Sequence, residues 1–347
     1  MTCLRNDSLD LVYADDMYAT FICLATSFVN LVVNGIVTFC LLKLDVMRNT
    51  FAYLNVSLSV ADCGILAIFL LWVTPVTFRR NSQLAMSTLG KRIGQLSLVF
   101  WFASLYATLA ISINRFVAVA KFNQYETVFS LKNTKKIIVA TWVAALTHGL
   151  LYFYPGCDFV YDPAHYFFHF VESPCQPITV FMDLGYGIFF IAVIFVINLC
   201  TGFKSHFSSP KFGDLQVAPV TRNDKERKKR QKRETKFFIQ SALNALFFEL
   251  MLFSFHVVSR LVTDKWALFF ATSWIWQFSH GTNGFILFFF NSDLRRGLLN
   301  WVFCLNEREP AQPLGNVAKP ARRKTFGGQE AACQTTRTLR PPTTGRY

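Results

Sequence analysis

Residues 52–75 read AYLNVSLSVADCGILAIFLLWVTP, and this stretch decides the fold. Asp62 is its only formally charged residue. A run of roughly 20 apolar residues is long enough to cross the hydrocarbon core of a bilayer as an α-helix. Only helices and closed barrels satisfy their backbone polar groups inside lipid, and this run is too long for a barrel strand. The stretch therefore predicts a transmembrane helix.

Six more apolar stretches of this kind occur along the chain: Tyr18–Leu42, Ile93–Val119, Ile137–Tyr154, Ile178–Phe203, Phe237–Val262 and Trp266–Phe290. With Ala52–Pro75 they predict an all-α integral membrane bundle of seven helices. A soluble protein with seven buried helices is disfavoured, because apolar runs of about 18 residues or more are typical of membrane spans.

Composition and charge agree with a membrane protein of one domain. The chain is 52% hydrophobic, and only 16% of its residues are charged. The formal net charge of +14 could indicate a nucleic-acid partner, but its placement argues otherwise. Lys and Arg favour one side of the spans by roughly four to one, which places the N-terminus outside. The basic charge therefore follows from topology, and it also suits contact with anionic membrane lipid.

We expect three parts: an extracellular N-terminus (1–17), a seven-helix domain with a short amphipathic helix after it (18–303), and a disordered cytoplasmic tail (304–347). The tail is rich in Pro, Gly, Thr and Arg and cannot bury a core. The first span is expected to act as an uncleaved signal anchor, because no signal-peptide core precedes it. Asn6-Asp7-Ser8 fits a glycosylation acceptor that would face the lumen.

Ionisable residues inside the apolar stretches are the first functional candidates, because a buried charge in lipid is costly. They are Asp62, Arg115, Asp183, Glu249, His256 and Arg260. Asn34 and Asn283 are polar and uncharged residues of the first and last spans.

The order of these residues resembles that of rhodopsin-like G-protein-coupled receptors. The resemblance rests on Asn34, Leu58-x-x-Ala61-Asp62, Asn114-Arg115-Phe116, Trp142 and Asn283-Gly284-Phe285-Ile286-Leu287. Three further motifs are similar to nematode serpentine receptors of class x, a group of chemosensory receptors. They are Ile111-Ser112-Ile113-Asn114-Arg115-Phe116, Pro155-Gly156-Cys157-Asp158-Phe159 with Pro174-Cys175, and His280-Gly281-Thr282-Asn283-Gly284-Phe285. The resemblance covers roughly residues 20 to 300.

The resemblance assigns signal transduction to Asn114, Arg115 and Phe116. It implies that Arg115 is released when the sixth helix moves outward and then meets a heterotrimeric G protein. Asn114 stands where an acidic residue is usual, and an amide offers only a neutral hydrogen bond. We therefore expect a looser resting state with more basal signalling.

The resemblance also implies that Asn34, Asp62 and Asn283 meet in the middle of the bundle. Two alternatives are open at this polar core. Asp62 either holds a sodium ion or is a protonated, hydrogen-bonded carboxyl without an ion. No other metal or cofactor is expected.

The positions of the cysteines differ from the pattern of rhodopsin-like receptors. Rhodopsin-like receptors tie the second outer loop to a cysteine at the top of the third helix, but residues 77 to 100 contain none. We expect a Cys157–Cys175 disulfide within the loop, with Cys3 as a rival partner. Cys304, after the short helix, is a candidate for palmitoylation at the inner leaflet.

The resemblance places the ligand between helices in the outer half of the bundle. The candidate ligand-binding residues are Ser97, Phe100, Trp101, His148, Asp183, Tyr186, His256, Trp274 and Gln277. A small-molecule ligand is expected. An amine is disfavoured, because Ser97 stands where amine receptors carry an aspartate.

Other classes of function explain the sequence less well. No phosphate-binding loop, metal-spaced set or nucleophile arrangement indicates an enzyme, and no Lys inside the seventh span could bind retinal. The prediction is a chemosensory G-protein-coupled receptor of the plasma membrane, in the sensory cilium by resemblance. A neuropeptide-type receptor and, less favoured, a seven-span transporter or channel stay open. The sixth helix lacks the proline that usually kinks it, so its outward movement needs another explanation.

Overall fold

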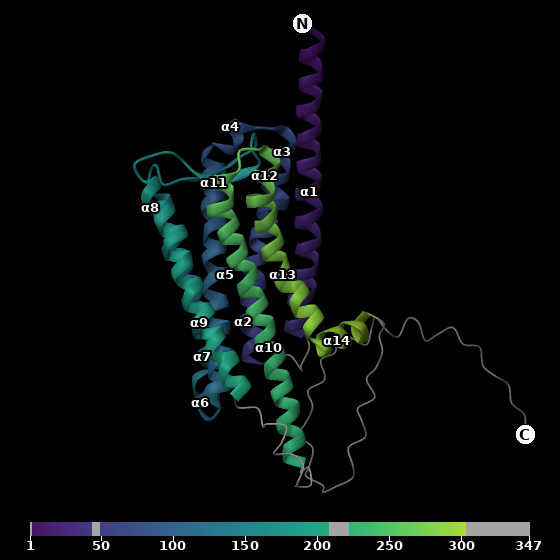
Figure 1. Ribbon diagram of the computed structural model, residues 1–347, viewed down its shortest axis with the longest axis vertical. Coiled ribbons are helices and arrows are strands. Elements are labelled where there is room, and N and C mark those ends of the chain that lie inside the picture. The colour runs from purple at the N-terminus through teal and green to yellow at the C-terminus, as the bar shows by residue number, and fades with distance from the viewer. Residues whose placement is uncertain (1, 44–48, 208–221, 303–347) are drawn as a thin grey trace, which may run out of the picture. The chain divides into compact units, whose positions relative to one another are not determined.

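The computed structural model describes residues 2–43, 49–207 and 222–302. Most of these residues are helical (Figure 1). The helices before the second outer loop are α1 Thr2–Lys43, α2 Thr50–Ile68, η2 Phe69–Val73, α3 Thr74–Arg79, α4 Ser82–Ala85, α5 Thr88–Ala120, α6 Phe122–Val128, α7 Leu131–Gly149 and η3 Leu150–Phe153. Those after it are α8 Gln176–Val180, η4 Phe181–Gly185, α9 Tyr186–Phe207, α10 Arg222–Phe253, η6 Ser254–Val258, α11 Ser259–Leu261, α12 Lys265–Phe269, η7 Phe270–Trp274, α13 Ile275–Phe290 and α14 Ser292–Val302.

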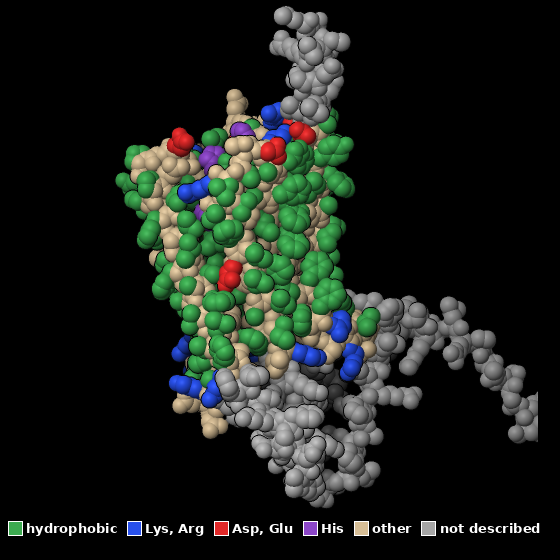
Figure 2. Space-filling view, viewed as in Figure 1, with side chains coloured by type: hydrophobic (Ala, Val, Ile, Leu, Met, Phe, Trp, Pro, Cys, Tyr) green, Lys and Arg blue, Asp and Glu red, His purple; other side chains and the backbone are tan. Residues whose placement is uncertain are grey.

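Seven helical spans form the compact unit that ends at Leu294. Six described helices are long and apolar enough to cross a membrane. The seventh, Lys265–Phe290, is equally continuous but carries buried Gln277, His280 and Asn283, which lower its hydropathy. Hydrophobic side chains cover the flank of the bundle, and charged ones gather at its two ends (Figure 2). This is the surface that a bilayer requires.

The third span, α5, is the centre of the bundle. In its most apolar window 78% of the residues are buried, against 17% in the fifth span. It packs against α2, α7, α9 and α10. The spans at the periphery turn one face to lipid, whereas α5 is surrounded by other helices. Its side chains therefore contact several helices at once.

The first helix differs from its expected form. Its predicted start was Tyr18, but α1 begins at Thr2 because residues 2–17 contain neither Gly nor Pro to end a helix. The extension places Asp15 beside the outer end of the seventh span. The carboxylate of Asp15 lies 3.0 Å from Lys265 Nζ and accepts a hydrogen bond from Trp266 Nε1 at 3.2 Å.

A β-hairpin stands among the outer loops, an addition to the all-α expectation. Strands β1 Phe159–Asp162 and β2 Phe167–Phe170 pair antiparallel, with Phe159 opposite Phe170 and Asp162 opposite Phe167. We call these two strands and their turn the outer hairpin. The predicted Cys157–Cys175 disulfide closes its base, with 5.2 Å between the Cα atoms.

The outer hairpin covers the outer mouth of the bundle. Phe159 and Phe168 are 1% exposed, and their rings lie 6.1 and 5.4 Å from that of Trp276. Gly94 of α5 permits this approach, because a Cβ there would overlap the carbonyl oxygen of Phe159. The cover is therefore a packed aromatic layer.

A turn of π-helix, η6, lies in the sixth span, which lacks the usual proline, and another, η7, lies in the seventh. The two turns meet, and Ser254 Oγ donates to the carbonyl oxygen of Ala271 at 2.8 Å. A π-helical turn bends a helix without proline and often marks a functional site.

Candidate functional site

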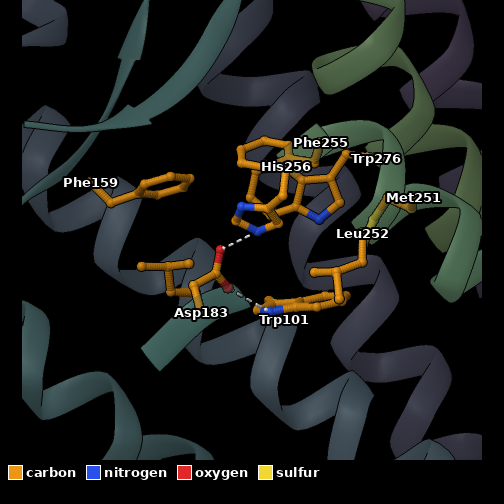
Figure 3. Close-up of a pocket in the computed structure, with 9 residues that line it drawn as sticks. Trp101, Phe159, Asp183, Met251, Leu252, Phe255, His256 and Trp276 are labelled. Atoms are coloured by element: carbon orange, nitrogen blue, oxygen red, sulfur yellow. Dashed lines mark hydrogen bonds and ion pairs between the residues drawn. The ribbon is translucent and has the colours of Figure 1, made fainter. Parts of the chain in front are cut away.

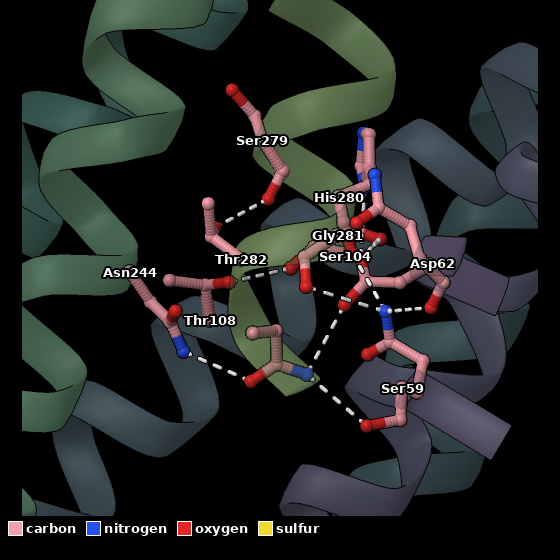
Figure 4. A network of polar contacts seen from close by, with 12 residues as sticks. Ser59, Asp62, Ser104, Thr108, Asn244, Ser279, His280, Gly281 and Thr282 are labelled. Atoms are coloured by element: carbon pink, nitrogen blue, oxygen red, sulfur yellow. Dashed lines mark hydrogen bonds and ion pairs between the residues drawn. The ribbon is translucent and has the colours of Figure 1, made fainter. Parts of the chain in front are cut away.

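The polar core is built around a fully buried pair of side chains. Asp62 of α2 lies with Oδ1 2.7 Å from Nδ1 of His280 of α13, and both residues are 0% exposed (Figure 4). Ser104 of α5 donates to the same oxygen at 3.1 Å. Asn283 donates to Oδ2 of Asp62 at 3.1 Å. The carboxyl group therefore has three hydrogen-bonding neighbours from two other spans.

Asn283 extends this core to a fourth span. Its Nδ2 also donates to Ser59 Oγ at 3.1 Å, and its Oδ1 accepts from Asn244 of α10 at 2.9 Å. The core thus links α2, α5, α10 and α13, so that a movement of α10 must disturb hydrogen bonds around Asp62.

Asn34 lies beside this core rather than on its carboxyl group. Its Nδ2 donates to the carbonyl oxygens of Asn30 at 3.0 Å and His280 at 3.2 Å. Sequence reasoning placed Asn34, Asp62 and Asn283 together, and missed His280 and Ser104. His280 stood in a motif already singled out, whereas Ser104 carried no signal.

Both alternatives for Asp62, a sodium ion and a hydrogen-bonded carboxyl group, stay predictions. Ser104 and Asn283 turn donors toward the carboxyl oxygens, so a cation there would require both side chains to reorient. No group of three or more His, Cys, Asp or Glu side chains among the described residues could hold a metal ion.

Arg115 lies at the inner end of α5, enclosed by two aromatic rings. Its Cζ is 4.2 Å from the ring centroid of Phe51 of α2 and 5.1 Å from that of Phe237 of α10. The guanidinium also donates to Asn114 Oδ1, with 3.1 Å from Nε. Only 3% of Arg115 is exposed, while the neighbouring Phe116 is partly exposed. Cation–π contact therefore joins α2, α5 and α10.

Asn114 holds a second contact at this end. It donates to the Tyr125 hydroxyl at 3.2 Å, and that hydroxyl lies 2.7 Å from Thr50 Oγ1. Asn114 thus accepts from Arg115 and donates toward α6, a pair of roles that a carboxylate could not fill, because it has no N–H.

The outer pocket lies beneath the outer hairpin. Asp183 points to two partners across it (Figure 3). Its Oδ2 is 3.0 Å from His256 Nε2, and its Oδ1 accepts from Trp101 Nε1 at 3.1 Å. Turn η4 supplies Asp183 and turn η6 supplies His256. The cavity encloses about 20 Å³, room for roughly one water molecule.

Three predicted ligand residues, Trp101, Asp183 and His256, line this pocket. Sequence reasoning missed the other members, which are Leu98, Phe159, Met251, Leu252, Phe255 and Trp276. Leu98 lies three residues before Trp101 and Leu252 four before His256, so helical spacing could have found both. Phe159 could not have been found in this way, because it belongs to strand β1 of the outer hairpin and to none of the spans.

The remaining predicted ligand residues lie elsewhere. His148 and Tyr186 meet at Tyr106, whose hydroxyl is 3.0 Å from His148 Nδ1 and 3.3 Å from the Tyr186 hydroxyl. The others have partners outside this pocket: Ser97 with the Gly94 carbonyl, Phe100 with Trp142 of α7, Trp274 with Phe278, and Gln277 with the Ser273 carbonyl. Cys304 and the side chains of Asn6 and Cys3 lie outside the described residues.

Comparison with known proteins agrees with this geometry. A family model described as serpentine type 7TM GPCR chemoreceptor Srx matches residues 24–291. Serpentine receptor class X 45 of Caenorhabditis elegans is 24% identical over 327 residues, which cover 90% of this chain and 87% of that protein. Squid rhodopsin has a similar fold, with a TM-score of 0.70 and 13% identity over 86% of this chain and 89% of its own. The chain is thus a multi-pass membrane receptor and no enzyme, and it belongs to the Srx family of serpentine G-protein-coupled chemoreceptors.

Proposed function

We propose that this receptor binds a small molecule in the outer pocket and signals to a heterotrimeric G protein through the inner ends of α5 and α10. The observation that carries the proposal is the position of Arg115 between Phe51 and Phe237. A buried arginine at the inner end becomes available to a partner only when Phe237 moves away with α10.

The outer pocket favours a small ligand over a peptide. The outer hairpin packs over the pocket, and the cavity is close to the size of one water molecule. Ligand entry therefore requires that side chains such as Leu252 or Phe255 move. Asp183 and His256 sit in π-helical turns, so a ligand that separates them would act on the bends of the fifth and sixth spans.

We place the receptor in the plasma membrane, with the sensory cilium as the proposed site. Membrane lipid surrounds the apolar flank. Sodium is not needed for the proposed mechanism, because hydrogen bonds already occupy Asp62.

The test is a G-protein reporter in cells that express the full chain, screened with volatile and water-soluble small molecules. We expect a response that Arg115→Ala abolishes while surface expression persists. Arg92→Ala is the matched control, because Arg92 also lies over an aromatic ring, 4.6 Å from the Phe153 centroid, but at the outer end. A response that survives Arg115→Ala, or an ion current without a G protein, would overturn the proposal.

Basal signalling tests the same contact without a ligand. Phe237→Ala removes one wall around Arg115 and should raise basal signalling several-fold. Asn114→Asp replaces a neutral hydrogen bond by an ion pair and should lower it. Basal signalling that neither change alters would count against a resting role for this cluster.

A further inference from the structure

A groove between the fifth and sixth spans opens toward lipid. It has a volume of about 380 Å³, within the range of small-molecule sites. Its lining is apolar except for one carboxyl group: Leu184, Ile188, Ile191, Ala192, Phe195, Glu249, Leu252, Phe253 and Val257.

Glu249 is the unusual member of this lining. It lies near the middle of the span Thr235–Leu261, roughly 20 Å along the helix axis from either end. It is partly buried and has no hydrogen-bond or ion-pair partner among the described side chains. Figure 2 shows acidic colour half-way down the otherwise hydrophobic flank. A carboxyl group at this depth in the membrane is costly in free energy. Its presence therefore indicates a functional site in which a bound group serves as its partner.

We propose that this groove is a binding site for a lipid-soluble amine, with Glu249 as its counter-ion. Such an amine enters the bilayer uncharged. At Glu249 the proton of the carboxyl group passes to the amine nitrogen, which leaves a carboxylate and an ammonium ion in contact. The complex is neutral overall, and both groups are satisfied.

The direction of the groove excludes an ordinary phospholipid headgroup as the occupant. Along the sixth span the lining runs from Glu249 of α10 outward to Val257 of η6, roughly 12 Å along the axis. Glu249 is therefore at the deep end, where a headgroup held at the interface does not reach. A free amine with an apolar body of this length fits with its nitrogen deep and its body pointing outward.

Leu252 connects this groove to the outer pocket, because its side chain lines both. It packs against Gly187 of α9, where an added Cβ would lie 3.2 Å from Leu252 Cδ2. An occupant of the groove therefore touches the wall that the two sites share. The groove is a second site, and the proposed role of the outer pocket does not depend on it.

The experiment uses the purified full chain in phosphatidylcholine nanodiscs. The probes are dodecylamine and dodecanol, each with a photoactivatable diazirine on the chain, and labelled peptides are identified by mass spectrometry. We expect the amine to label α9 and α10 about tenfold more than the alcohol does. Glu249→Gln should remove that preference. Glu172→Gln, the same change at an exposed outer-loop position, should retain it.

A second pair of variants tests the groove by volume. Ile188→Trp fills the groove from a side chain that is 54% exposed, so the fold should tolerate it, and it should reduce labelling by both probes. Phe189→Trp changes the adjacent lipid-facing residue, which does not line the groove, and should leave labelling unchanged. Equal labelling by amine and alcohol in the unmodified chain, or an amine preference that survives Glu249→Gln, would refute the proposal. So would photo-crosslinks to a second copy through this face. The readout needs no signalling, so its failure would leave the proposed function standing.

Discussion

Two aspartate–histidine pairs lie inside the bundle, and their surroundings differ. In the polar core Asp62 lies 2.7 Å from His280, with Ser104 and Asn283 on the same carboxyl group. In the outer pocket Asp183 Oδ2 lies 3.0 Å from His256 Nε2, Asp183 Oδ1 accepts a hydrogen bond from Trp101 Nε1, and a cavity lies beside them.

The difference separates a structural role from a binding role. A carboxyl group that three hydrogen-bonding side chains surround gains nothing from a ligand and loses much if its partners move. A carboxyl group beside a cavity can exchange one partner for another. We therefore assign the inner pair to the coupling of helices and the outer pair to recognition.

The largest expected effect comes from the inner pair. Asp62→Ala leaves His280, Ser104 and Asn283 without their shared acceptor in the core. We expect a loss of about 3–5 kcal/mol in stability, as when one partner of a buried pair is removed. Thermal unfolding of the purified receptor in detergent measures it. Asp183→Ala is the matched change at the outer pair, and an equal or larger loss there would remove the distinction between the pairs.

The outer pair should instead affect ligand potency. Asp183→Ala removes one hydrogen bond from Trp101, which contributes about 1 kcal/mol to stability, and the contact with His256. Water can enter the enlarged cavity and take the place of the carboxylate at both partners. We expect the potency of an activating ligand to fall about tenfold or more while thermal stability changes little. Concentration–response curves in the reporter assay measure this. Unchanged potency would mean that the ligand binds away from this pocket.

The smallest expected effect is a loss of stability of the outer hairpin in acid. Burial of the imidazole lowers the pKa of His169 from its ordinary 6.5, while nearby Asp162 opposes the shift. The opened hairpin therefore binds a proton more readily than the folded one. Its stability should be complete above about pH 6.5 and should decrease as the pH falls below that value.

Hydrogen exchange of peptides that cover residues 159–170, corrected for intrinsic rates, measures this acid response. His169→Gln should remove the additional opening at pH 5.5. His165→Gln, at an exposed neighbour, should retain it. Equal opening in the unmodified chain and in His169→Gln would mean that another group is responsible.

Much of the fold was predictable because membrane spans follow from local composition. The seven predicted stretches agree with the observed helices to within a few residues, except at the starts of α1, α7 and α10, the last of which begins at Arg222 instead of Phe237. Those three helices extend into polar sequence that contains no Gly or Pro. The outer hairpin and the π-helical turns were not predicted, since short strands and single-turn distortions depend on packing partners distant in the chain.

The candidate sites were predictable only in part, for a related reason. Asp62, Arg115, Asp183 and His256 stood out because a polar or charged side chain is rare inside an apolar run. His280 and Ser104 became important only because the fold brings them, from two other helices, within hydrogen-bonding distance of Asp62. Phe159 entered the outer pocket only because Gly94 lets the hairpin backbone approach α5.

The sequence alone determined the number of spans, their orientation and the costly residues within them, because lipid constrains each helix separately. Tertiary structure decided which of those residues became partners. Asp62 is enclosed by hydrogen-bonding side chains from two other spans, Asp183 faces a cavity, and Glu249 points into a lipid-facing groove without a described partner. These three carboxyl groups look alike in the sequence, because each is an acidic residue inside an apolar stretch. Only the packing of neighbouring helices gives them different environments.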